Sequence, residues 1–145
     1  MPFNTNVSKL LQVINTLRKG GEQMPIQTAH VFFAIMARPG ITMAQLAEEV
    51  GLSQSSCSRN VAALGEWHRL GKPGYDLIES TNDPNEGRRL IMFLSPKGRQ
   101  LARQLIVAID PNSVVEDFRF PSAKEYLNGV YQRSLAGKNV NKTGL

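Results

Sequence analysis

Residues 41–64, ITMAQLAEEVGLSQSSCSRNVAAL, decide the fold of this chain. Thr42 and Gln45 have the spacing of a capping box, in which each side chain accepts a hydrogen bond from a free backbone N–H of the other residue. This pair predicts the start of a short helix over residues 44–50. Gly51 follows directly, and glycine is typical of the position that ends a helix.

A second helix is predicted immediately after this turn. Ser53 can cap its first turn, and the helical pattern continues through about Trp67. At about 100° per residue, one side of the helix carries Cys57, Val61, Leu64 and His68. The opposite side carries Ser55, Arg59, Ala62 and Glu66, with Ser58 beside them and Gln54 and Ser56 in the first turn. Two short helices joined by a turn that contains glycine are a helix-turn-helix candidate.

The hydroxyl-rich side of the second helix has the properties of a surface that reads DNA. Small side chains allow close approach, and serine and glutamine both donate and accept hydrogen bonds. Arginine can bind guanine through two hydrogen bonds or contact a phosphate. The alternative is an amphipathic helix whose polar side only faces solvent. The preceding short helix, the turn and the hairpin that follows favour binding in the major groove of double-stranded DNA.

The flanking segments predict a mainly helical fold. Apolar residues at helical spacing predict helices over residues 7–19 and 28–37. The pair Ser95-Pro96 is a capping serine followed by a proline at the first helical position, and it predicts a helix that stops at residues 110–111. A last amphipathic helix is expected near residues 122–135, ahead of a polar tail.

A small β-hairpin interrupts these helices. Strands are expected over residues 77–80 and 88–95, joined by the turn TNDPNEG. In the second strand the apolar residues Leu90, Met92 and Leu94 alternate with Ile91 and Phe93. Because successive strand residues point to opposite faces, both faces of the hairpin need cover from the rest of the chain.

Two arginines end the turn of this hairpin. A two-stranded wing after a helix-turn-helix places its tip over the adjacent DNA backbone or minor groove, where cations are favoured. Arg88 and Arg89 lie there, with Asp83 and Glu86 close in sequence. One arginine can pair with Asp83 and brace the turn, while the other is freer to meet a phosphate. The alternative for both is a pair of solvated surface charges.

Composition sets wider limits. The chain has 145 residues, enough for one domain with a hydrophobic core, and 41% of them are hydrophobic. Its net charge of +5 permits a polyanionic partner without demanding one. A lone cysteine fits a reducing compartment. The N-terminus lacks the pattern of a signal peptide, and no apolar stretch has membrane-spanning length. We therefore expect a cytoplasmic protein.

The segments ITMAQLAEEVGLSQSSCSRNVAAL and DPNEGRRLIMFLSPKGRQL, in this order, resemble the MarR (multiple-antibiotic-resistance regulator) family of winged helix-turn-helix transcription factors. The resemblance covers about residues 24–105. It implies a homodimer on a palindromic operator, with recognition helices in successive major grooves and interlocked terminal helices. Matching positions of the recognition helix are Gln54, Ser55, Ser56, Ser58 and Arg59, and those of the acid and arginine that brace the wing are Asp83 and Arg88. Asn85 stands where such wings commonly carry a minor-groove arginine.

These observations predict a sequence-specific regulator that binds double-stranded DNA. We expect Arg59 and Ser55 to read bases, and Arg89, with Lys97, to hold the DNA backbone. The remaining contacts to bases or phosphates are assigned to Gln54, Ser56, Ser58, Asn85 and Arg88. The expected division is an N-terminal dimerisation helix over residues 1–27, a winged helix-turn-helix core over 28–95, and C-terminal dimerisation helices with a mobile polar tail over 96–145.

Other functions have less support. The two histidines, His30 and His68, have no companions at metal-ligand spacing, and no phosphate loop or nucleophile motif occurs, so we expect no enzyme, metal or cofactor. Cys57 could sense oxidants, but its place on the apolar side favours a small core residue. The rival function is a winged helix that binds a protein in a transcription or replication complex. A small-molecule effector is left open.

Overall fold

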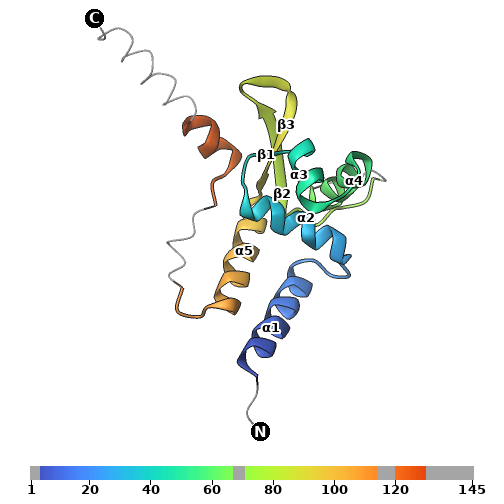
Figure 1. Ribbon diagram of the computed structural model, residues 1–145. Helices are drawn as coiled ribbons and strands as arrows, with labels where there is room; N and C mark the ends of the chain where they lie inside the picture. Colours follow the sequence, from blue (N-terminus) through green and yellow to red (C-terminus); the bar gives the residue numbers. More distant parts are fainter. Residues whose placement is uncertain (1–3, 67–70, 114–119, 130–145) are drawn as a thin grey trace, which may run out of the picture.

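The computed structural model describes residues 4–66, 71–113 and 120–129 (Figure 1). The elements in chain order are α1 (Thr5–Gly20), α2 (Ile26–Ala37), β1 (Ile41–Thr42), α3 (Met43–Val50), α4 (Gln54–Leu64), β2 (Ile78–Asp83), β3 (Glu86–Leu94) and α5 (Pro96–Ile109). Residues 123–129 are also helical. The prediction of a mainly helical winged helix-turn-helix is confirmed.

The two central helices begin where their capping residues predict. The Thr42 Oγ1 accepts a hydrogen bond from the Gln45 backbone N–H at 3.2 Å, and the Gln45 Oε1 accepts one from the Thr42 N–H at 3.1 Å. Gly51 ends α3 with a φ of 71°, a left-handed conformation that glycine adopts without strain. The Ser53 Oγ caps α4 by accepting from the Ser56 N–H at 3.1 Å. Helix α4 ends at Leu64, earlier than predicted, and Trp67 lies outside the described residues.

The hairpin is longer than the sequence pattern indicates. Strands β2 and β3 are antiparallel, and only Pro84 and Asn85 remain between them. Strand β1 adds a third member by pairing Ile41 with Met92 and Thr42 with Ile91. A strand of two residues has no period to recognise, so β1 could not be found from the sequence. Figure 1 shows the β2–β3 hairpin projecting as a wing beside α3 and α4.

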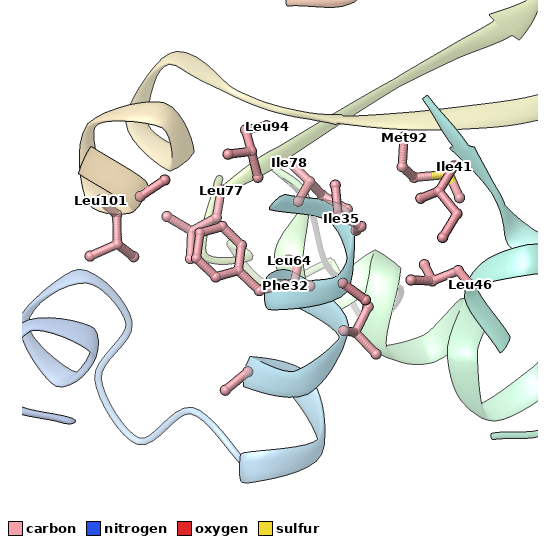
Figure 2. Close-up of a cluster of buried hydrophobic side chains, with 14 of the residues drawn as sticks. Phe32, Ile35, Ile41, Leu46, Leu64, Leu77, Ile78, Met92, Leu94 and Leu101 are labelled. Carbon is pink, nitrogen blue, oxygen red and sulfur yellow. The ribbon is translucent and has the colours of Figure 1, made fainter. Parts of the chain in front are cut away.

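One hydrophobic core joins the helices to one face of this sheet. Figure 2 shows its members converging from α2, α3, α4, β3 and α5, and they include Phe32, Ile35, Leu46, Leu64, Leu77, Met92, Leu94 and Leu101. The other face is covered by the helical segment 123–129, whose Tyr126 ring lies 5.1 Å from the Phe93 ring. The prediction that both faces of the hairpin need cover is confirmed.

Helix α5 starts at a crowded position. The Ser95 Oγ accepts from the Gly98 N–H at 3.0 Å and donates to the Asp76 carbonyl oxygen at 2.7 Å. Residue 98 must be glycine, because a Cβ there would collide with the carbonyl oxygen of Leu77. These contacts anchor α5 beneath the sheet, where it also packs against α1.

Helix α1 exposes most of its apolar stripe. Leu17 is buried, but Leu10, Leu11 and Ile14 are 66%, 60% and 50% exposed. The apolar spacing thus predicts this helix correctly, although the rest of a single chain does not cover the apolar face of α1. None of the helices in the described ranges has both the length and the hydropathy that a membrane crossing requires.

Candidate nucleic-acid interface

Helix α4 presents a polar side to solvent. Cys57 and Leu64 are completely buried, while Ser55 and Arg59 are exposed. Gln54 is also exposed, and Ser56 and Ser58 are half-buried. The predicted orientation of the helix is confirmed: its thiol faces the core and its hydroxyl-rich side faces outward. The contacts of these residues with DNA remain a prediction.

A buried asparagine attaches α4 to α2. The Asn60 Nδ2 donates to the Ser56 carbonyl oxygen at 2.9 Å and to the Gln27 Oε1 at 3.2 Å. Its Oδ1 accepts from the Thr28 Oγ1 at 2.7 Å. A satisfied polar group inside the protein ties the two helices in one orientation. Asn60 is absent from our predicted site, although its place three residues after Cys57 is a signal that it points inward.

An ion-pair cluster holds the wing turn. The Asp83 Oδ2 accepts from the Arg89 Nη2 at 2.7 Å and Nε at 3.0 Å, and its Oδ1 accepts from the Asn85 N–H at 2.9 Å. The Arg89 Nη1 also lies 3.0 Å from the Glu86 Oε2. The side chain of Asp83 is nearly buried, at 11% exposed. The carboxylate of Asp83 therefore joins the turn residue Asn85 to Arg89 of β3.

The assignment of the brace to Arg88 is wrong, because Arg89 makes this contact. Adjacent strand residues point to opposite faces, and an irregularity in the register between Asn82 and Asp83 brings the carboxylate to the face of Arg89. Arg88 is exposed and forms no hydrogen bond or ion pair with another described residue. The cation that the wing leaves available is Arg88, and Arg89 is held by two acids.

The charges of the brace reinforce one another. The hydrogen bond from the Asn85 N–H and then that from Arg89 lower the pKa of Asp83 below its ordinary value. The Asp83 carboxylate in turn raises the pKa of Arg89. Both groups are charged at neutral pH, so the wing turn carries an intact ion pair under ordinary conditions.

Substitution of Asp83 by asparagine should lower the thermal stability at pH 7. Since the pKa of Asp83 is lowered in the folded state, its stabilisation is complete above the ordinary value of 3.8 and is lost as pH falls through the folded pKa. The difference in melting temperature between Asp83→Asn and the wild type should therefore be smaller at about pH 2 than at pH 7, with the decrease confined to pH values below about 4. Glu86→Gln is the control, because Glu86 is more exposed and should matter less. An equal difference at both pH values would contradict this role.

Two further predicted site residues lie in different places. Asn85 is exposed at the tip of the wing. Lys97 lies in the first turn of α5, the helix that follows β3 at the end opposite the wing tip (Figure 1). Its Nζ donates to the Tyr75 carbonyl oxygen at 3.0 Å. The structure therefore does not bring Lys97 together with the outward side of α4 and the wing.

Cys57 is a core residue. Its side chain is completely buried within the hydrophobic cluster, and burial raises the pKa of its thiol. A protonated, inaccessible thiol is a poor nucleophile. Within the part of the chain that the structure describes, no three His, Cys, Asp or Glu side chains gather as metal ligands would.

Comparison with known proteins agrees with this geometry. The model of a family described as winged helix-turn-helix DNA-binding matches residues 30–66, which include α3 and α4. No curated protein matches the chain.

Three solved structures share the fold across almost the whole chain. RV1404 from Mycobacterium tuberculosis has 18% identity over 97% of this chain and 88% of its own, with a TM-score of 0.58. MepR of S. aureus, solved in complex with DNA, has 15% identity over 91% and 93%, with a TM-score of 0.58. MarR has 22% identity over 99% and 95%, with a TM-score of 0.50. This chain is therefore a winged helix-turn-helix protein with the MarR-type fold.

Proposed function

We propose that the protein is a MarR-type transcriptional regulator that binds double-stranded DNA in a sequence-specific way. The observation that carries this proposal is the outward side of α4, where Gln54, Ser55 and Arg59 are exposed on a helix whose other side is locked into the core. The shared fold supports it, and one structure with that fold, MepR, is a DNA complex. The protein would act by binding, without catalysis, in the cytoplasm.

Helix α4 would enter the major groove. Arg59 has the length and the paired donors to bind a guanine edge, and Ser55 lies one helical turn before it on the same side. Gln54, Ser56 and Ser58 would supply further contacts to bases or phosphates. In the wing, Arg88 would contact the adjacent backbone with Asn85 beside it, while the Asp83–Arg89 pair keeps the turn in shape.

The protein would work as a homodimer. The apolar stripe of α1 is exposed in one chain, and Ile109 at the end of α5 is 54% exposed. Burial of such residues against a second copy removes apolar surface from water. We propose that residues 1–27 and 96–145 supply this interface. A two-fold dimer would place its two α4 helices about one turn of DNA apart, roughly 34 Å.

Selection of bound sequences from a random duplex pool tests this function. The expected result is enrichment of a palindrome, because a symmetric dimer presents the same reading surface twice. Its half-sites should be centred about 10 base pairs apart. A pool without any enriched sequence after several rounds would contradict sequence-specific binding.

A salt titration separates DNA binding from the rival function as a protein-interaction module. If Arg88 and other cations contact phosphates, affinity for random duplex should fall steeply between about 50 and 200 mM salt. Absence of binding even at 50 mM salt would favour the protein-interaction module.

A further inference from the structure

Helix α4 has different neighbours on the two flanks of its outward side. The flank that carries Val61 and Gly65 borders a cavity of about 400 Å³, whose other walls include strand β2 of the wing. The flank that carries Asn60 and Ala63 borders a cavity of about 690 Å³, whose other walls are the start of α2 and residues 72–75. The wing and residues 72–75 therefore lie on opposite flanks of the side of α4 that faces outward.

Backbone hydrogen bonds hold residues 72–75 against the end of α4. The Gly74 N–H donates to the Glu66 carbonyl oxygen, and the Tyr75 N–H donates to the Ala63 carbonyl oxygen, both at 2.9 Å. Gly74 makes this close approach possible, because a Cβ there would collide with backbone oxygens of α4 and its cap. Lys72 comes two residues before this anchor and is exposed. Its side chain therefore extends into solvent from a fixed place beside α4.

The acids and the cations near the end of α4 are separated. Arg59 and Lys72 are the cations among the described residues that line the larger cavity, and none of those residues is an aspartate or glutamate. Glu66 and Asp76 line the smaller cavity on the wing side, together with Glu79. Neither cation forms a hydrogen bond or ion pair with another described residue. Both are therefore available to an anion that approaches the outward side of α4.

The wing supplies little positive charge of its own. Between residues 83 and 89, Asp83 and Glu86 balance Arg88 and Arg89, and Arg89 is held by both acids. A helix in the major groove fills a space about 12 Å wide, with a sugar-phosphate backbone on each side. The wing can reach the backbone on its own side of α4. The backbone on the other side would pass Lys72.

We propose that Lys72 binds a DNA phosphate on the side of α4 opposite the wing and so holds the second strand that borders the groove. This inference rests on the proposed function. A lysine suits such a contact, because its ammonium is a compact charge on a flexible stem and accepts a phosphate from many directions. The contact would strengthen binding to every sequence, since a phosphate carries no base information. The selection of bases would stay with Arg59.

The salt dependence of DNA binding tests the charge of Lys72. Lys72→Gln should weaken operator and random duplex by the same factor, at least about tenfold at 0.1 M salt, because the dimer loses two phosphate contacts. The slope of log affinity against log salt should become shallower by about 2. Lys72→Arg keeps the charge and should keep the slope. Arg38→Gln is the control, since it removes an exposed cation outside both cavities.

Neutral phosphates locate the contact on the DNA. In an operator scanned with single methylphosphonates, one position in each half-site should weaken the wild type and have no further effect on Lys72→Gln. The same scan with Arg88→Ala should identify a phosphate on the other strand that borders the groove. These comparisons do not depend on a change in folding, because each variant is measured against its own unmodified operator.

Several outcomes overturn the assignment of Lys72. They are an unchanged salt slope for Lys72→Gln, equal losses for Lys72→Gln and Arg38→Gln, and a loss confined to the operator, which would make Lys72 a base reader. A scan in which Lys72 and Arg88 share one phosphate also contradicts it. In each of these cases the wild type still binds DNA, so the proposed function stands. A wild type that binds no duplex even at 50 mM salt overturns both.

Discussion

Replacement of Arg59 by alanine should lower the affinity for the selected operator by about 1–3 kcal/mol, or roughly 5- to 150-fold. Arg59 is exposed on the outward side of α4, whose opposite side is fixed by Cys57, Asn60 and Leu64. Its loss would remove hydrogen bonds to a base edge without disturbing the core. Discrimination should fall with affinity, so that the variant binds operator and random duplex more equally. Fluorescence anisotropy with both duplexes measures this effect.

Two other arginines provide matched controls for Arg59. Arg88→Ala should weaken operator and random duplex by the same factor, because a phosphate contact carries no base information. Arg38→Ala should change neither, since Arg38 is exposed at the end of α2 and belongs neither to α4 and the wing nor to the proposed dimer segments. Retention of full affinity and selectivity by Arg59→Ala would remove Arg59 from the reading surface. Equal losses for Arg59→Ala and Arg38→Ala would reveal only a general effect of charge.

Replacement of Phe32 by alanine should destabilise the fold by about 3–5 kcal/mol, a large part of the stability of a small domain. Phe32 is completely buried on α2, at the centre of the core that supports α4 and the sheet (Figure 2). The change removes apolar contacts and leaves a cavity that close-packed neighbours fill only partly. Urea unfolding at one fixed protein concentration measures the effect, because the stability of a dimer depends on concentration.

The neighbouring residue is the matched control. Phe33 is 37% exposed, and its ring lies 6.0 Å from that of Phe32 in a tilted arrangement. Phe33→Ala should cost clearly less than Phe32→Ala, because over a third of Phe33 is already exposed to water in one chain. Similar losses for the two variants would show that burial within one chain does not decide the stability.

Local sequence patterns predicted the helix-turn-helix well because the interactions that form it are local. The capping pair Thr42 and Gln45 and the cap at Ser53 join residues three positions apart, so the same bonds can be inferred from spacing. The inward direction of Cys57 follows from helical periodicity alone. The exposed stripe of α1 shows the limit of such patterns, because periodicity identifies an apolar face and does not say which chain covers it.

The sequence by itself determined where the capped helices α3, α4 and α5 begin, which side of α4 is polar, and that the hairpin needs cover on both faces. Tertiary structure alone decided that Arg89, not Arg88, binds Asp83, that Asn60 joins α4 to α2, and that Lys97 lies apart from the wing. These outcomes depend on register irregularities and on partners that are distant in the chain. A residue's own neighbours in sequence cannot specify such contacts, since they form only when separate elements pack together.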